Sequence, residues 1–156
     1  MERTLVILKP DALCRGLCGQ ILARFERKGL KIVALKMMRI SRELAERHYA
    51  PHKGRDFYEP LIRFMTSTPV IVLVLEGKEA IAISRRMMGS TFGSDAEAGT
   101  IRGDLGVSRR FNLIHGSDSS ESAAREVALF FEPGELYEYE PGAWQWVYDF
   151  STGEPV

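Results

Sequence analysis

The sequence is poor in cysteine, and its cysteines are badly spaced for cross-linking. Among 156 residues there are two, Cys14 and Cys18, with no second pair elsewhere. Thiols four positions apart and without further partners argue against a disulfide framework and against a zinc site. We therefore expect the protein in a reducing cytoplasm.

Neither sign of charge is in excess. Lysine and arginine together number 21, as do aspartate and glutamate, so the formal net charge is +0 at pH 7. A chain without a global basic field is not drawn to nucleic acid or to an anionic membrane, so neither is expected as the main partner. Any affinity for phosphate must come from a local group of cations.

Long apolar runs are missing as well. The run Leu5–Leu8 is too short for a secretory signal, and it ends at Lys9-Pro10-Asp11. No later run reaches the length that a bilayer span needs. We therefore expect no membrane association.

The size and composition fit one globular domain with a full core, since 45% of the residues are hydrophobic and 27% are charged. We expect a single domain over residues 1–156. Its last part, residues 132–156, is rich in aromatic side chains that would be costly to leave in water. This C-terminal extension should pack across the domain or on a neighbouring subunit.

Hydrophobic periodicity predicts alternating strands and helices. Strands are expected at 4–9, 30–40, 70–75 and up to residue 115, helices at 17–28, 41–49, 56–66, 79–88 and 119–131, and a long loop at 89–104. This order favours an α/β fold of the α+β kind, a ferredoxin-like sandwich in which helices cover a four-stranded antiparallel sheet on one side. The glycine fingerprint of a doubly wound sheet is absent.

The most informative stretch is Phe111–Ser119, in which an apolar run ends on His115, breaks at Gly116 and gives way to helix-capping residues. Such a junction exposes the histidine. A neutral imidazole carries a nucleophilic lone pair, and the following helix N-terminus offers N–H groups to an anion. The pattern suggests phosphoryl transfer, although a histidine at a strand end is more often structural.

Two further side chains have two readings each, and a pair of histidines has the spacing of a metal site. Glu126 flanks the buried stripe of the next helix, where it is either an orienting partner for the imidazole or a solvated acid. Lys9, at the end of a strand, either meets a phosphate or extends to water. His48 and His52 have the spacing of two metal ligands on a helix, but Pro51 between them spoils that geometry.

Three segments together resemble the nucleoside diphosphate kinase family: Leu8–Asp11, Gly99–Asp104 and Asn112–Ser119. The similarity extends from about Glu2 to Tyr148. It implies reversible transfer of the terminal phosphate from ATP or another nucleoside triphosphate to a nucleoside diphosphate. The transfer would follow a ping-pong mechanism through a phosphohistidine, with Mg²⁺ carried by the nucleotide phosphates and no metal ligand from the protein.

The resemblance also implies residue roles. His115 would be the nucleophile, with Glu126 orienting it and Ser117 assisting. Other catalytic or phosphate-contacting positions are matched by Lys9, Tyr49, Arg85, Thr91 and Arg102, and ribose and base positions by Asn112 and Phe57. As the P–O bond loosens in the transition state, charge spreads over the oxygens of the terminal phosphate, and several fixed hydrogen-bond donors would stabilise that charge. A base that stacks on the Phe57 ring without hydrogen bonds to its edge would be bound with low specificity, because every base has a π-face.

The chain departs from the family pattern at several positions. Phe92-Gly93-Ser94 stand where Asn-Pro-Ala is usual, and Ala98 stands where proline is common. This loop meets neighbouring subunits in hexameric relatives, so the departures leave the assembly open, while the length of the tail favours a hexameric homo-oligomer over a tetramer. Arg109 replaces an apolar residue near the base, which leaves the base preference open.

Two rival functions remain at this stage. One is an interaction or nucleic-acid-binding protein whose kinase site is idle, which the balanced charge disfavours. The other is a phosphate-releasing enzyme with a histidine nucleophile, which would need a proton donor for the departing alcohol and easy entry of water.

Overall fold

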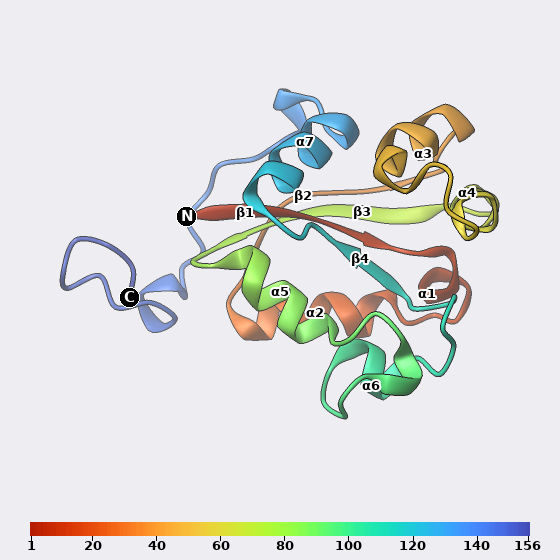
Figure 1. Ribbon diagram of the computed structural model, residues 1–156. Coiled ribbons are helices and arrows are strands. Elements are labelled where there is room, and N and C mark those ends of the chain that lie inside the picture. The colour runs from red at the N-terminus through yellow and green to blue at the C-terminus, as the bar shows by residue number, and fades with distance from the viewer.

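The computed structural model describes residues 1–156 and contains one antiparallel sheet. Its strands are β1 (Glu2–Leu8), β2 (Lys31–Met38), β3 (Val70–Gly77) and β4 (Ile114–Gly116), in the spatial order β2-β3-β1-β4. The central pair runs from Glu2 opposite Gly77 to Leu8 opposite Ile71. The predicted four-stranded ferredoxin-like sandwich is confirmed (Figure 1).

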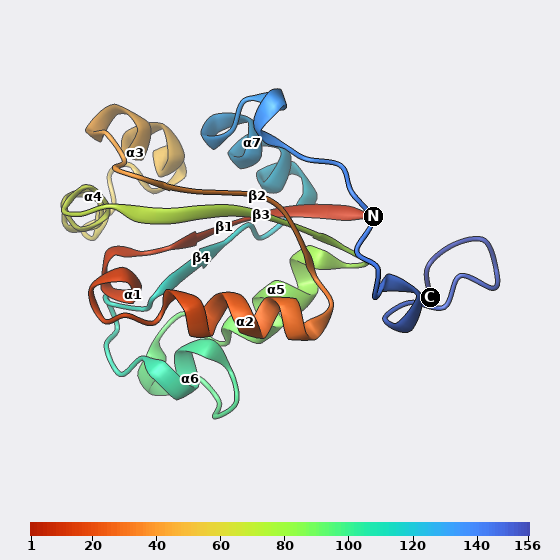
Figure 2. The same cartoon turned by 180° about the vertical axis from the view of Figure 1, so that it is seen from behind.

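Helices lie on both faces of the sheet, as the two opposite views show (Figures 1 and 2). On one face lie α1, α2, α5 and α6. On the other lie α3, α4 and α7, which share one hydrophobic cluster, with α4 toward one end of the sheet. Their bounds are α1 (Pro10–Cys14), α2 (Cys18–Lys28), α3 (Arg42–His48), α4 (Tyr58–Thr66), α5 (Ala80–Met88), α6 (Ile101–Leu105) and α7 (Ser120–Phe130).

The expectation that the sheet needs cover on one side only was wrong. In β1, Leu5 and Ile7 belong to one hydrophobic cluster, whereas Val6 and Leu8 belong to another on the opposite face. Successive side chains of a strand point to opposite faces, so a fully apolar strand must be buried twice. This double burial fixes the two central strands as a rigid base for the residues at their ends.

The expected loop at 89–104 contains a helix that its composition hides. Thr100 caps α6 by accepting a hydrogen bond from the backbone N–H of Gly103 at 3.0 Å. Gly103 has no room for a side chain, because a Cβ there would lie 1.8 Å from the carbonyl oxygen of Glu97. A helix of this length shows no periodicity, and the same holds for α1, which begins at Pro10 and was expected to be loop.

The C-terminal segment packs only in part. Lys31 holds it by donating to the carbonyl oxygen of Tyr139 at 2.8 Å, and its ammonium lies 5.0 Å from the ring centroids of Tyr139 and Trp144. Trp146, in contrast, is 86% exposed. None of the helices combines the length and the apolar character that crossing a membrane requires.

Candidate active site

His115 stands in the short edge strand β4, where it pairs with Ile7 of β1. Its side chain is 21% exposed, so a ligand can reach it. The backbone entering the strand is held in an unusual conformation, with Leu113 at φ 70°. The Leu113 N–H donates to the carboxylate of Asp11 at 3.0 Å, and its carbonyl accepts from the N–H of Lys9 at 2.8 Å. These contacts hold the strained residue in place beside the histidine.

Glu126 reaches the imidazole from α7 and is buried, so it is not a solvated acid. Its Oε2 lies 3.0 Å from Nε2 of His115 and accepts from the hydroxyl of Ser117 at 2.6 Å. Burial alone would raise the pKa of this carboxyl, but the two hydrogen bonds and the imidazole charge lower it to about 2. A carboxylate only accepts, so Nε2 of the neutral ring carries the proton and Nδ1 carries the lone pair.

Lys9 is buried beside this pair and does not extend to water. Its ammonium donates to Oδ1 of Asn112 at 2.7 Å, and the amide nitrogen of Asn112 donates to the carbonyl of Thr91 at 2.9 Å. Burial lowers the pKa of Lys9 to about 8, with a further contribution from the charge of Arg102. These contacts join the end of β1 to two segments that are distant in the sequence.

Arg102 is 5% exposed and reaches the site from α6. Its guanidinium donates to the carbonyls of Gly89, Asn112 and Ile114 at 3.1, 3.1 and 2.6 Å. Burial lowers its pKa to about 10, with a contribution from the nearby charge of Arg85. Such anchoring to backbone fixes the orientation of the planar group before any ligand arrives.

The three cations at the site lack counter-ions. Arg85, on α5, donates to the carbonyl of Gly116 at 3.2 Å. None of Lys9, Arg85 and Arg102 forms an ion pair, although eight such pairs exist away from the site. Lys9 and Arg102 are buried, whereas Arg85 is exposed. A buried positive charge without a counter-ion is costly, and an anion would relieve that cost for Lys9 and Arg102.

Tyr49 and His48 bring aromatic side chains from the end of α3 against the histidine. Tyr49 is 5% exposed, its ring centroid lies 6.5 Å from that of His115, and its hydroxyl has no partner. Burial raises the pKa of this phenol, as does the charge of Glu126. The ring of His48 is closer, at 4.7 Å and an interplanar angle of 83°. Burial lowers the pKa of His48 to about 3, so this ring is neutral.

Sequence reasoning missed His48, because it considered this residue only with His52. The structure separates those two, since α3 ends at His48 and a 3-10 turn follows from Ala50 to His52. Its position before Tyr49 at a helix end was the only available signal, and that position is not diagnostic.

Two expected residues lie at the rim. Phe57 precedes α4 and is 47% exposed, and His52 links it to Tyr49 through ring centroid distances of 5.3 and 6.2 Å. Thr91 is exposed and joins the site through its carbonyl contact with Asn112. The structure thus gathers the other expected residues, and these two border them.

Two departures from the family pattern contact each other. The guanidinium of Arg109 lies 4.7 Å from the ring centroid of Phe92, in cation–π contact. Gly93 is also explained, because a Cβ there would lie 2.6 Å from the backbone of Gly106. Nothing in the structure explains Ala98.

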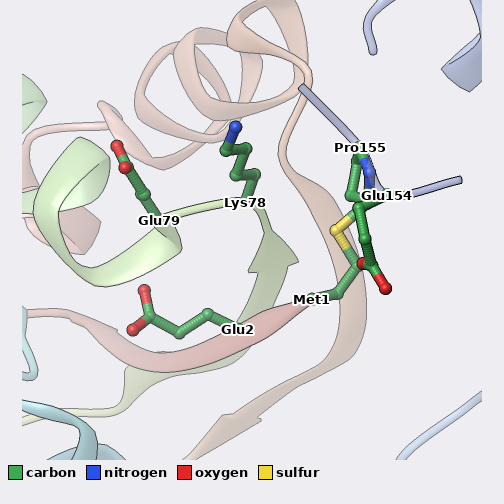
Figure 3. A pocket seen from close by; sticks show the side chains of 6 residues that line it. All are labelled: Met1, Glu2, Lys78, Glu79, Glu154 and Pro155. Carbon is green, nitrogen blue, oxygen red and sulfur yellow. The ribbon is translucent and has the colours of Figure 1, made fainter. Parts of the chain in front are cut away.

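A separate hollow lies at the far end of β1 (Figure 3). Its residue Glu2 is about 16 Å along the strand from Ile7, the partner of His115, because a strand rises roughly 3.3 Å per residue. Its lining residues are Met1, Glu2, Lys78, Glu79, Glu154 and Pro155. Its three carboxylates outnumber its two ammonium groups, those of Lys78 and the N-terminus, which disfavours a phosphate ligand there. The group around His115 is therefore the better candidate for a site that handles phosphate.

Comparison with known proteins agrees with this geometry. The family model described as nucleoside diphosphate kinase matches residues 2–136. A nucleoside diphosphate kinase of Carboxydothermus hydrogenoformans is 56% identical over 149 residues, which cover 96% of this chain and 100% of the relative. One from Pyrococcus furiosus is 55% identical over 151 residues, with 95% and 93% covered.

Solved structures give the same result. A halophilic nucleoside diphosphate kinase from Halobacterium salinarum in complex with CDP superposes with a TM-score of 0.93 at 49% identity, covering 95% of this chain and 99% of that one. A nucleoside diphosphate kinase family protein from Babesia bovis gives 0.92 at 45% identity, with 95% and 100% covered. The chain therefore belongs to the nucleoside diphosphate kinase family, whose enzymes reversibly transfer the terminal phosphate of a nucleoside triphosphate to a nucleoside diphosphate through a phosphohistidine.

Proposed function

We propose that His115 is the residue that carries the phosphate, and that Nδ1 is the attacking atom. The observation that carries this proposal is the hydrogen bond between Nε2 and the Glu126 carboxylate, at 3.0 Å. Because a carboxylate only accepts, this contact supports a neutral ring with its proton on Nε2 and its lone pair on Nδ1. It also offsets the positive charge that the ring gains when Nδ1 bonds to phosphorus.

The reaction proceeds in two displacements at one site. In the first, Nδ1 forms a bond to the terminal phosphorus while the bond from that phosphorus to the bridging oxygen breaks, and the nucleoside diphosphate leaves. In the second, a terminal phosphate oxygen of another nucleoside diphosphate attacks the same phosphorus and the N–P bond breaks. Ser117 supports both steps indirectly by its 2.6 Å hydrogen bond to Glu126.

We assign the phosphate contacts to Lys9, Arg85, Arg102, Thr91 and Tyr49. The lack of counter-ions on the three cations supports this, because their charge is free to offset that of the transferred group. The raised pKa of Tyr49 keeps its unpartnered hydroxyl protonated, so it can donate to a phosphoryl oxygen.

We assign the ribose to Asn112 together with Lys9, and the base to Phe57. The exposed ring of Phe57 at the rim supports a stacking role, which would accept every base. Arg109 on Phe92 would then lie near the outer part of the nucleotide site and modulate the preference among bases.

We propose Mg²⁺ as the cofactor, carried by the nucleotide phosphates. The donor set supports this arrangement, because the site is rich in cations and each of its carboxylates already accepts a hydrogen bond: Glu126 from Ser117, and Asp11 through Oδ2 from the Leu113 N–H. Phosphate oxygens would therefore hold the ion. Bound there, Mg²⁺ would neutralise part of the phosphate charge.

We also propose a homo-oligomer, with a hexamer favoured over a tetramer, in the cytoplasm. Leu35 and Met37 on the edge strand β2 are 46% and 60% exposed, and Trp146 is more exposed still. A neighbouring copy would cover such apolar side chains on a sheet edge. The free thiols of Cys14 and Cys18 suit a reducing compartment. Sedimentation analysis of the purified protein tests the assembly.

A phosphoenzyme experiment tests the central assignment. Incubation with ATP labelled in its terminal phosphate should give an acid-labile, alkali-stable labelled protein that GDP discharges. The His115→Ala variant should take up no label, and intact protein that stays unlabelled would contradict the assignment. Steady release of phosphate without an acceptor would indicate a phosphatase, and tight binding of single-stranded DNA at physiological salt would favour the interaction role.

A further inference from the structure

Three side chains that commonly bind transition metals meet beneath the nucleotide site. One ligand atom from each of His48, His115 and Glu126 lies within 4.8 Å of the other two. Nε2 of His115 and Oε2 of Glu126 are 3.0 Å apart. The three residues come from α3, β4 and α7, so only the fold brings them together.

His48 is the member of this group that phosphoryl transfer does not use. Its side chain is 3% exposed, and neither ring nitrogen has a hydrogen-bond partner. Leaving a buried polar group unpaired costs about 1–3 kcal/mol, so its presence calls for a reason. The ring packs against that of His115 in T-shaped contact, at the edge of the site. An imidazole nitrogen with a free lone pair is a ready metal ligand.

We propose that His48, His115 and Glu126 form a binding site for a divalent transition metal, best matched by Zn²⁺, and that binding there blocks phosphoryl transfer. Two imidazoles and one carboxylate form a ligand set that Zn²⁺ uses in proteins. Mg²⁺ prefers oxygen ligands in octahedral geometry, so it does not compete for this set.

The distances are close to those of a metal centre. With metal–ligand bonds of about 2.1 Å, tetrahedral ligand atoms lie roughly 3.4 Å apart. The His115–Glu126 pair, at 3.0 Å, is already near that separation. The nitrogen of His48, which lies up to 4.8 Å from its partners, has to approach by about 1 Å. Water would supply the fourth ligand of a tetrahedral centre.

Metal binding changes the tautomer of His115. The metal takes the lone pair of Nε2, so the proton on that nitrogen moves through solvent to Nδ1, and no proton is released overall. Nδ1 then carries hydrogen and has no lone pair for the phosphorus. The inhibition rests on the proposed function, because it requires Nδ1 to be the nucleophile, whereas the metal site stands without it.

Zinc titration of the full chain in the absence of nucleotide tests the site. Calorimetry should give one Zn²⁺ per chain, and His48→Phe and Glu126→Gln should bind at least tenfold more weakly. The matched control is His52→Phe, which removes the one remaining histidine of the chain and should bind like the wild type. Equal affinity of His48→Phe and wild type would overturn the proposal.

Two further measurements separate the alternatives. The absorption spectrum of Co²⁺ bound to the wild-type protein should show nitrogen and oxygen ligands, whereas a sulfur charge-transfer band would assign the metal to Cys14 and Cys18 and overturn the site. This spectrum is informative even where His48→Phe does not fold.

Phosphoenzyme formation from MgATP tests the consequence. Zinc at a saturating concentration should slow the reaction at least tenfold in wild type, EDTA should restore it, and His48→Phe should be insensitive. Any effect of zinc on the nucleotide itself acts on both proteins equally. Binding at the three side chains without inhibition would leave the metal site standing and refute the assignment of Nδ1.

Discussion

Replacing Glu126 by Gln isolates the charge that we place behind the nucleophile. The substitution keeps the size of the side chain and one carbonyl oxygen, but it removes the negative charge that accepts from His115 at 3.0 Å and from Ser117 at 2.6 Å. An amide can also turn its NH₂ group toward Nε2, which would draw the ring into the wrong tautomer. The substitution therefore changes only the orientation of His115 and the negative charge beside it.

The size of the effect follows from the hydrogen bond. A hydrogen bond to a charged group contributes about 1.5–3 kcal/mol, and this one strengthens when the ring becomes positive in the phosphorylated state. Since roughly 1.4 kcal/mol corresponds to a factor of ten, we expect kcat to fall about 10- to 150-fold. KM should change little, because Glu126 contacts no part of the nucleotide in the proposed mechanism.

The assay is rapid-quench measurement of phosphoenzyme formation from ATP, together with steady-state transfer to a second diphosphate. Glu121→Gln is the matched control, because Glu121 is exposed in the first turn of the same helix. It should leave both rates unchanged. A Glu126→Gln protein that is folded and forms phosphoenzyme within threefold of the wild-type rate would refute the orienting role.

Three further predictions concern other residues of the site, and a fourth concerns the stability contributed by Glu126. Because the pKa of Lys9 is lowered to about 8, its positive charge is lost as pH rises through that value, so phosphoenzyme formation should decline on the alkaline side, and Lys9→Met should be slow at every pH. Arg102→Met leaves three backbone carbonyls without a hydrogen-bond donor, so urea denaturation should show a loss of roughly 2–5 kcal/mol in unfolding free energy. A loss below about 1 kcal/mol would contradict this reading. Phe57→Ala should raise KM about 5- to 150-fold for purine and pyrimidine nucleotides alike, and a selective effect on one base would speak against stacking alone. The carboxyl of Glu126, with its pKa lowered to about 2, contributes roughly 1–3 kcal/mol of stability that is present above about pH 4.5 and lost as pH falls through 2; Glu126→Gln should flatten this part of the pH–stability curve.

Much of the fold could be read from the sequence because its elements carry strong local signals. Val70–Leu75 is continuously apolar, which is typical of a strand buried on both faces, and it lies in the centre of the sheet. The short helices α1 and α6 were missed, since five residues are too few for periodicity to show. Their formation depends on a proline at the first position in one case and on the Thr100 cap in the other.

The sequence by itself also determined which residues to consider, because a histidine between an apolar strand and a capped helix is a local pattern. What only the tertiary structure decided is how their charges and protons are arranged. The Lys9–Asn112 contact joins residues 103 positions apart, and burial there moves the pKa of the lysine to about 8. His48 meets His115 only because α3 and β4 pack together, and no spacing along the chain could reveal that contact. Desolvation and neighbouring charge are properties of the packed site, so they cannot be read from the order of the residues.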